Sequence, residues 1–366
     1  MRIAILSLHW PRTLASGVGR KFQRQITAWR GLGHEVQFFS HLHFPPDNAP
    51  MVAGEYFPYT LKSGPLGLLP SELSRMRALK EMIAAVQDYR PDVIYLRWSM
   101  YVYPLQRLFA IAPTVLEINT NDVEEHRLLG LVRSSYNRLT RAITLGGASG
   151  IVYATRELSE LDVFQSFHKP GVVISNSIEV DSVPCMPAPD NRHPHLVFIG
   201  TPGFAWHGVE KLIPLAQTFP DIVIDVIGYD HIEGADRIPD NLILHGYQVG
   251  EACDRILARA DAAIGTLALH RAGLNEASPL KVRDCVSRGI PIILPFVDTD
   301  LDSLQSDLIL RIPNTDDNTR THGGQIHDFL LKARGRRLAR ELTRERIDSR
   351  VKEQQRLDFL AGIARS

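Results

Sequence analysis

The chain has 366 residues, enough for two domains of ordinary size, and its 44% hydrophobic and 22% charged residues are typical of a soluble globular protein. No window holds the roughly 18 uninterrupted apolar residues of a membrane span, and three scattered cysteines suggest a reducing compartment rather than a disulfide framework or a zinc site. The net charge is zero but uneven: +5 over residues 1–176, −11 over 177–331 and +6 over 332–366.

The basic first segment and basic tail fit two interpretations: contact with an anionic membrane surface or an anionic acceptor, or solubility alone. No basic run is interleaved with aromatic residues, so a nucleic-acid partner is not expected.

The first half of the chain alternates buried strands with helices. Residues 2–8 indicate a strand rather than a signal peptide, and a helix over 20–29 and a strand over 34–39 complete a β-α-β unit with parallel strands. Between the first strand and this helix, Gly17, Val18 and Gly19 form a turn that allows close approach of the backbone to a ligand. The pattern then predicts helix 72–89, strands 93–96 and 114–118, a helical stretch over 123–147, and strands 151–153 and 172–174.

Three stretches of this half have both a structural and a functional interpretation. The apolar loop 64–70 either packs on its own domain or touches an acceptor or a lipid surface. Arg97–Trp98 and the polar cluster 119–122 each follow a strand, and ligands gather at the carboxyl ends of strands in open α/β sheets. Capping of the loop explains the polar cluster equally well.

A second β-α-β series begins with the strand 195–200, after a linker over 177–194. The loop 200–208, which contains Gly203, repeats the N-terminal order of strand, glycine loop and helix. The expected elements that follow are helix 209–219, strands 222–228 and 242–245, helix 250–259, strands 262–264 and 290–294, and one or two charged helices over the last ~35 residues. Two similar α/β halves predict a ligand cleft between them.

The stretch 275–284 carries the strongest chemical signal. Ser278 is a good helix cap and Pro279 fits the first helical position. The free N–H groups of such a helix start, at Ser278 and Leu280, bind anions. Lys281 in the first turn opposes the helix dipole, which indicates that its charge has another use.

Two carboxylates flank this helix start. Glu276 precedes it and Asp284 lies eight residues further on. An anion held beside two carboxylates that bind hydroxyl groups describes a sugar phosphate. The alternative is a capped surface helix with ordinary charges.

Taken together, these motifs resemble those of the retaining glycosyltransferases of the GT-B fold, family four, which includes mannosyl-, glucosyl- and N-acetylglucosaminyltransferases. Five pieces carry the resemblance in the family's order: the glycine turn 17–19 with the strand at 33–36, the turn 176–178, the segment 206–209, the strand 241–247, and Glu276 with Asp284 as the E-x7-E motif.

The resemblance implies an α/β chain of two Rossmann-like, doubly wound parallel-sheet domains that face each other across a cleft. The expected bounds are 1–176 for the acceptor domain, 177–345 for the nucleotide-sugar domain, and 346–366 for a C-terminal helix that packs back on the first domain.

It also implies metal-independent transfer of a sugar, with retained anomeric configuration, from a nucleotide-diphosphate sugar. Asp284 would bind the ribose, Glu276 the donor sugar or departing phosphate, and residues 17–19 would lie under the diphosphate. The base would be held by backbone near Gly228 and Tyr247. Neither a cofactor nor a metal ion is expected.

The sequence departs from the family pattern at several positions. Thr201 and His207 stand where the family has an arginine and a lysine for the diphosphate, so Lys281, and His207 if protonated, would replace those charges. Asn119 stands where a histidine is common; an amide binds a sugar hydroxyl but cannot shuttle a proton. Asp284 replaces a glutamate, and the stretch 276–279 lacks the family's glycines.

These observations predict a cytoplasmic glycosyltransferase, either free or at the inner membrane face, that acts on a glycan or lipid-linked acceptor in cell-surface polysaccharide or glycoconjugate synthesis. The alternatives are another GT-B enzyme, such as a sugar-nucleotide epimerase, and an inactive binding subunit. Asp298-Thr299-Asp300 matches the metal-binding D-x-D of a different glycosyltransferase fold, but it follows a late strand and is interpreted as a turn.

Overall fold

The computed structural model describes residues 1–9, 13–14, 16–43, 50–62, 64 and 67–365. The chain forms two compact units. The first unit comprises Met1–Ile174 and Arg350–Ser366, and the second comprises Ser175–Ser349. Each unit contains one large sheet whose strands all run parallel.

The first unit is built on a seven-stranded sheet of order β3-β2-β1-β4-β5-β6-β7. Its short strands are nearly all apolar because helices cover both faces of the sheet. The strands are β1 (Arg2–Ser7), β2 (Glu35–Leu42), β3 (Glu55–Pro58), β4 (Val93–Arg97), β5 (Thr114–Ile118), β6 (Gly150–Tyr153) and β7 (Gly171–Val173).

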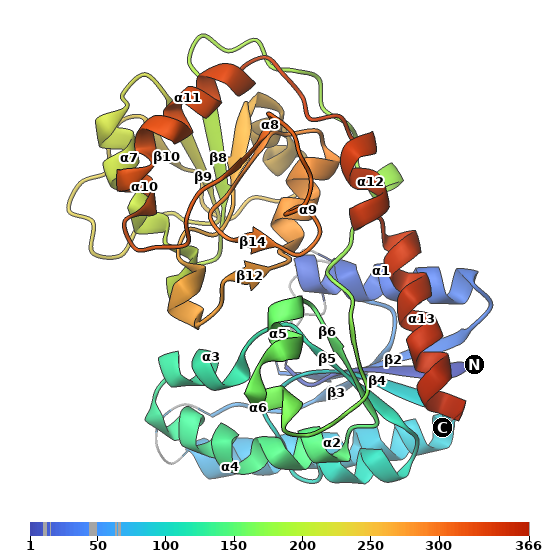
Figure 1. Cartoon of the computed structure of the whole chain (residues 1–366). Helices are drawn as coiled ribbons and strands as arrows, with labels where there is room; N and C mark the ends of the chain where they lie inside the picture. Colours follow the sequence, from blue (N-terminus) through green and yellow to red (C-terminus); the bar gives the residue numbers. More distant parts are fainter. Residues whose placement is uncertain (10–12, 15, 44–49, 63, 65–66, 366) are drawn as a thin grey trace. The chain divides into compact units, whose positions relative to one another are not determined.

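One face of this sheet carries α1 (Gly17–Gly31) and α13 (Ser349–Arg365), and the other carries α2 (Leu68–Tyr89), η2 (Leu105–Ala110) and α4 (Leu131–Gly147) (Figure 1). Alternate residues of β1 and β4 meet Phe22, Ile26 and Trp29 of α1 in a buried core. The unit also contains the short helices α3 (Asp122–Leu128), α5 (Arg156–Glu160) and α6 (Asp162–Gln165).

The second unit contains a six-stranded sheet of order β10-β9-β8-β11-β13-β15. Its strands are β8 (His195–Ile199), β9 (Val223–Ile227), β10 (Leu242–Leu244), β11 (Ala262–Ile264), β13 (Ile292–Leu294) and β15 (Ile309–Arg311). A separate two-stranded ladder pairs β12 (Glu276–Ala277) with β14 (Val297–Asp298). Both large sheets reverse their strand order once, between β1 and β4 and between β8 and β11, as doubly wound sheets do.

The second unit has no helix among its described residues as long as α2 of the first, which has 22 residues; its α11 has 11. α7 packs against β9 and β10, α8 against β8, and α9 against β13. Helical segments of this unit are η3 (Val180–Ser182), η4 (Ala205–His207), η5 (Val209–Lys211), α7 (Leu212–Thr218), α8 (Glu251–Arg259), η6 (Leu269–Ala272), α9 (Leu280–Ser287), α10 (Asn318–Thr321), α11 (Gly323–Ala333) and α12 (Glu341–Ile347).

Several sequence-based boundaries were wrong. The helix expected over 20–29 begins at Gly17, so the glycines form its first turn rather than a loop. The helical stretch 123–147 is two helices, because Gly130 adopts φ 109° between them. The helix expected over 209–219 is η5 followed by α7. The short strands β3, β14 and β15 and the helix α11 were not foreseen.

The apolar loop expected over 64–70 is only partly described, because residues 63, 65 and 66 lie outside the described residues. Its last residues, Leu68 to Pro70, begin α2 and are exposed. Packing on the domain is therefore the wrong interpretation for Leu68 and Leu69.

In the described part of the chain, no helix combines the length and apolar character that crossing a bilayer requires.

Candidate functional site

The glycine loop of the second unit lies at the point where the strand order of its sheet reverses. The loop follows β8 and ends in η4, and it is fixed to the segment after β11 by two backbone hydrogen bonds: Leu267 N–H donates to His207 O at 3.0 Å and Ala268 N–H donates to Trp206 O at 3.1 Å. Ligands of doubly wound folds bind outside the carboxyl ends of the strands at this point. The expected glycine loop therefore lies at the position where doubly wound folds bind ligands.

Glycines allow the loops after β8 and β9 to approach each other closely. Gly228 has φ +101°, and a Cβ there would lie 2.1 Å from the carbonyl oxygen of Gly200. The Gly228 N–H donates to Gly246 O at 2.7 Å, so Tyr247 follows directly on this turn with its side chain 70% exposed. Gly203 also has a positive φ of +86°, with open space around it.

Lys281 projects from the first turn of α9 to this loop. Its ammonium donates a hydrogen bond to Ile199 O, the last residue of β8, at 2.8 Å and lies 5.0 Å from the ring centroid of Phe198. Burial lowers the pKa of Lys281 to about 7. None of the ion pairs found among the described residues involves Lys281, so a largely buried cation faces the loop without a carboxylate to neutralise it.

His207 is uncharged, which corrects the expectation that a protonated imidazole replaces a family cation. Burial and the nearby Lys281 ammonium lower the pKa of His207 to about 2. Its Nδ1 accepts the Thr201 N–H at 3.0 Å and lies 3.1 Å from the Tyr229 hydroxyl. A ring that accepts at Nδ1 carries its proton at Nε2 and serves as a neutral donor there.

The helix start at α9 differs from the expected one. The N-cap is Pro279, and among the described residues no side chain caps the helix. Ser278 Oγ accepts no helix N–H; it accepts from Asn176 N–H at 2.9 Å and from Arg283 Nη2 at 2.8 Å. Leu280 and Lys281 are the first two helical residues, and their N–H groups precede the first intrahelical bonds.

The two carboxylates of the E-x7-E pattern lie in different environments. Glu276 is 7% exposed and starts β12. Asp284 lies on α9 and forms an ion pair with Arg288 at 3.2 Å, and Arg288 also pairs with Asp254 of α8 at 2.9 Å. A ribose hydroxyl at Asp284 would therefore share that carboxylate with Arg288.

In the first unit, the expected glycine turn is the start of α1. Ser16 caps the helix by accepting the Gly19 N–H at 2.9 Å, so that donor already has a partner. A Cβ at Gly19 would lie 1.9 Å from Thr13 O, which explains the glycine by packing. Gly17 and Val18 supply the first helical residues.

A buried charge network lies under the β1–β4 reversal point of the first unit. Glu117 accepts from Lys21 Nζ at 2.6 Å, from the Tyr95 hydroxyl at 2.9 Å and from Arg97 Nη1 at 3.2 Å. Burial alone would raise the pKa of Glu117, but Lys21 and Arg97 hold it well below its usual range. Arg97 is thus committed to an internal ion pair.

Asn119 follows β5 and carries an unused donor. Its Nδ2 is buried and has no hydrogen-bond partner among the residues that the structure describes. Buried side-chain donors are normally satisfied, so an unpartnered one at the carboxyl end of a strand indicates a ligand contact. Asn121, in contrast, is a helix cap that accepts the N–H groups of Val123 and Glu124.

Comparison with known proteins shows what this chain is similar to. A family model described as "Glycosyl transferase 4-like domain" matches residues 16–177. Three solved structures of similar fold are a sucrose-phosphate synthase from Thermosynechococcus elongatus (12% identity, TM-score 0.66, 100% of each chain), the lipopolysaccharide outer core galactosyltransferase WaaB (13%, 0.66, 99% of each chain) and an alpha-glucosyltransferase in complex with UDP and DNA (14%, 0.65, 99% of this chain and 100% of that chain).

Residues 16–177 form a glycosyl transferase 4-like domain. The whole chain has the GT-B fold, and both the fold and the resemblance predicted from the motifs are confirmed. The match to the glycosyl transferase model covers less than half of the chain, and the solved structures show the fold alone. Comparison of the sequence with curated proteins found no significant match.

The DNA in one of these complexes shows that this fold admits a nucleic-acid ligand. The expectation that this GT-B chain has no such partner therefore rests on its own charge pattern alone.

Sequence reasoning missed Arg283, which organises the helix start of this GT-B chain. Arg283 is fully buried and bonds Asp298 Oδ2 at 2.6 Å, Asp300 Oδ2 at 2.7 Å and Asn176 O at 3.1 Å. The D-x-D sequence is therefore part of an internal ion-pair network, with Asp298 at the end of β14 and Asp300 in the turn that follows. Among the described residues, no group of three or more His, Cys, Asp or Glu side chains is arranged to hold a metal ion.

Proposed function

We propose that this GT-B chain transfers a sugar from a nucleotide-diphosphate sugar, with retention of anomeric configuration and without a metal ion, to a glycan or lipid-linked acceptor of a cell-surface polysaccharide or glycoconjugate. We propose further that it works in the cytoplasm, in peripheral contact with an anionic membrane.

One observation carries this proposal: the Lys281 ammonium is largely buried beside the glycine loop, and its partner is a carbonyl oxygen rather than a carboxylate. A buried cation without a counter-ion is costly, and a diphosphate supplies the missing charge. The N–H groups at the start of α9 point to the same ligand, because helix N-termini bind phosphates.

In the proposed reaction, the bond between the anomeric carbon and the diphosphate oxygen breaks while a bond to the acceptor oxygen forms. Negative charge grows on the leaving diphosphate, where Lys281 and the α9 N–H groups stabilise it. A diphosphate oxygen takes the acceptor's proton, so neither a protein nucleophile nor a general base is required. His207 donates from Nε2 as a neutral group, and Asn119 Nδ2 donates to a sugar hydroxyl.

The first test is a thermal-shift panel with UDP, GDP, ADP, CDP and dTDP, each with and without EDTA. A nucleotide at ~100 times its dissociation constant stabilises the folded state by ~2.7 kcal/mol, which raises the Tm by a few degrees. We expect one nucleotide to stand out, equally with and without EDTA. No shift with any of the five would contradict the proposal.

The second test is turnover of the matching nucleotide sugar by Glu276→Ala. Glu276 is expected to contact the donor sugar or departing phosphate, so its removal should lower kcat at least ~100-fold, the scale for a key transition-state contact. Glu233→Ala, an exposed carboxylate of the same unit, is the matched control and should keep full activity. An unchanged rate for Glu276→Ala would remove this residue from the mechanism.

One observation favours a second function, an inactive binding subunit. Thr201 and a neutral His207 stand where the family has two cations, which leaves less positive charge for the diphosphate. A nucleotide that shifts the Tm without any turnover of its sugar conjugates would support that function.

A further inference from the structure

The outer helices of the first unit expose large apolar side chains. On α4, Leu131 is 86% exposed, Val132 85% and Leu139 79%. At the start of α2, Leu68 is 69% exposed and Leu69 is 70% exposed. Isolated exposed leucines are common, but clusters of this kind mark interaction sites.

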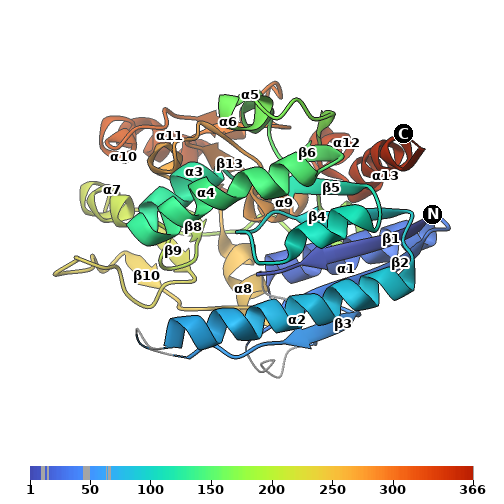
Figure 2. The ribbon, with the colours of Figure 1, turned by 90° about the horizontal axis from the view of Figure 1, so that it is seen from below.

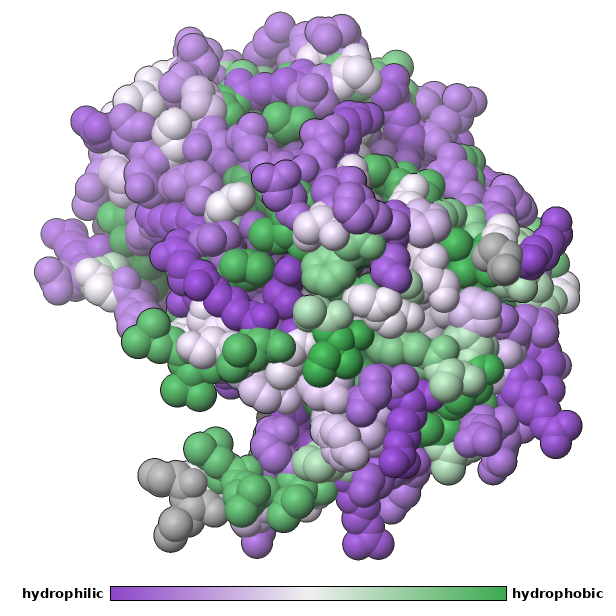
Figure 3. Space-filling model, turned by 60° about the horizontal axis from the view of Figure 1, so that its bottom comes forward, coloured by the Kyte–Doolittle hydropathy of each residue, from purple (hydrophilic) through white to green (hydrophobic). Residues whose placement is uncertain are grey.

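These two groups lie on one face of the unit. Figure 2 shows α2 and α4 on the same side of the sheet with their N-terminal ends at the same edge. Tyr136 of α4 lies within electrostatic range of Glu72 and Arg75 of α2, and its hydroxyl donates to Tyr101 O at 3.1 Å. In Figure 3, hydrophobic residues gather at the lower left of the face that is turned forward. We call this surface, formed by α2, η2 and α4, the outer helical face.

Cations outnumber carboxylates on the outer helical face. The sequence of α4 contains three arginines and no acidic residue. Arg141 is buried and paired with Asp122 at 2.9 Å, whereas Arg133 and Arg138 are exposed. On α2, the exposed carboxylates Glu72 and Glu81 are paired with arginines of the same helix, and a third exposed carboxylate, Asp88, lies near its end.

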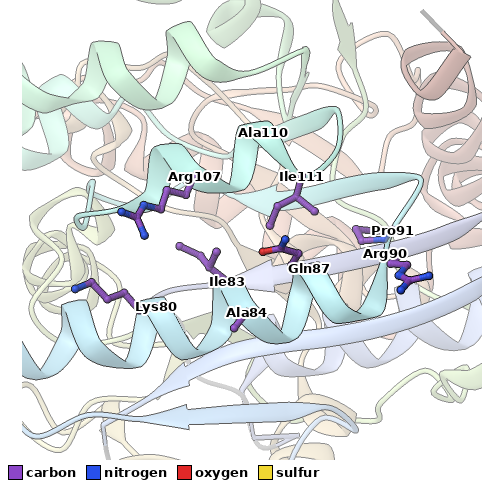
Figure 4. A pocket seen from close by; sticks show the side chains of 9 residues that line it. All are labelled: Lys80, Ile83, Ala84, Gln87, Arg90, Pro91, Arg107, Ala110 and Ile111. Atoms are coloured by element: carbon purple, nitrogen blue, oxygen red, sulfur yellow. The ribbon is translucent and has the colours of Figure 1, made fainter.

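A hollow of about 630 Å³ opens on this face between α2 and η2. Figure 4 shows its lining: the cations are Lys80, Arg90 and Arg107, and Ile83 and Ile111 contribute apolar side chains. Among the described residues that line the hollow, none is a carboxylate. Within the described residues, none of the ion pairs includes Lys80, Arg90 or Arg107.

We propose that the outer helical face docks on a bilayer that contains anionic phospholipid. The exposed leucines enter the boundary between headgroups and acyl chains, and the hollow between α2 and η2 receives a phosphate headgroup. An anionic lipid surface complements both kinds of side chain, because its acyl chains accept the apolar ones and its headgroups attract the cations that have no ion pair. A second copy of the chain complements it poorly, because two such faces would bring like charges together.

The surface deepens the membrane contact of the proposed function, but its test requires no sugar transfer. Failure to bind vesicles would therefore remove the membrane contact and leave the proposed sugar transfer standing. The experiment is co-sedimentation of the full chain with vesicles of phosphatidylcholine alone, or mixed about two to one with phosphatidylglycerol. We expect the chain to sediment with the mixed vesicles and to be released by salt, because the cations act through a screened field.

Two variants separate the apolar and charged contributions. L131S/V132S/L139S should abolish sedimentation, and K80Q/R107Q should weaken binding to mixed vesicles about tenfold or more, on the scale expected for two cations near an anionic surface. The matched control is L331S/L342S, which removes two leucines of the second unit that are 48% and 45% exposed. It should sediment as the wild type does.

The outcomes are decisive in both directions. Sedimentation with neither vesicle, or an equal loss in the control variant, overturns the proposal. So does a light-scattering mass that shows a dimer which L131S/V132S/L139S converts to a monomer, because a second copy would then cover this face. An unchanged Tm for each variant shows that it is folded.

Discussion

At the scale of single residues, the two basic side chains of the stretch 281–283 have separate roles. Lys281 faces the glycine loop and bonds a carbonyl oxygen, while Arg283 points into the protein and bonds two aspartates. Residues two positions apart in a helix point to different sides of it, so the two cations contact different neighbours. The sequence shows both charges, but only the packing tells them apart.

We expect Arg283→Met to destabilise the second unit by about 3–5 kcal/mol, because it leaves Asp298 and Asp300 buried without their cation. Urea unfolding followed by circular dichroism measures the loss. The control is Arg77→Met, which breaks a pair whose arginine is 85% exposed and should leave the unfolding midpoint unchanged. An Arg283→Met midpoint equal to that of the wild type would show that the network contributes nothing.

The pH dependence of nucleotide binding should report on Lys281. With a pKa of about 7 in the free protein, Lys281 is a cation below this pH and neutral above it, so its attraction for a diphosphate is present at pH 6 and fades as the pH rises toward 8. A bound anion favours the charged form and moves this window upward. Calorimetric titration at several pH values with the nucleotide selected by the thermal-shift panel measures the effect.

Lys281→Arg is the control for this titration. Arginine stays charged throughout the range, so protonation of the nucleotide itself is then the remaining source of pH dependence. The ratio of wild-type to variant affinity should fall as the pH rises. A constant ratio would show that Lys281 does not contact the phosphates.

At the scale of elements, a local capping signal competes with tertiary contacts at the start of α9. Ser278 followed by a proline is a good capping pattern, yet the helix begins one residue later because Ser278 Oγ is held by Asn176 and Arg283. Asn176 lies more than a hundred residues away in the chain. A contact so distant in sequence leaves no local signal, and this explains why the cap was predicted wrongly.

The loops after β8 and β9 give an element-scale prediction. Gly228→Ala would place a Cβ 2.1 Å from Gly200 O at φ +101°, so it carries both backbone strain and a steric clash. We expect a loss of about 2–4 kcal/mol in unfolding free energy. Gly234→Ala has a similar positive φ of +76° but open space, and should cost about 1–2 kcal/mol. Denaturant unfolding of both variants checks the difference, and equal losses would contradict the role of the close approach.

At the scale of the whole molecule, the end of the chain completes the fold of its beginning. Leu357, Leu360 and Ile363 of α13 belong to the same buried core as β1 and α1. Trp29 of α1 donates to Glu353 at 2.9 Å, and Glu353 pairs with Arg356 at 2.6 Å, all of them buried. The first unit is therefore discontinuous in sequence.

Leu360→Ala should destabilise the first unit by about 2–5 kcal/mol, because Leu360 is fully buried in this core. Val351→Ala, at a position of α13 that is 43% exposed, is the control and should change stability by less than about 0.5 kcal/mol. Thermal unfolding of the full chain gives both values. A Leu360→Ala Tm equal to that of the control would mean that α13 adds nothing to the first unit.

The sequence alone predicted most strands of the two large sheets, the doubly wound halves and, through the family resemblance, the GT-B fold; the stretch 275–284 as a focus of chemistry stays a prediction. Apolar runs and glycine turns are local, and a parallel β-α-β order follows from them directly. Tertiary structure alone decided the partners of the charges: Lys281 without a carboxylate, His207 held neutral, Arg283 and the D-x-D aspartates locked together, and Leu131 and Val132 left exposed. Burial and pairing depend on residues that are remote in the chain, and these set the charge and availability of each side chain.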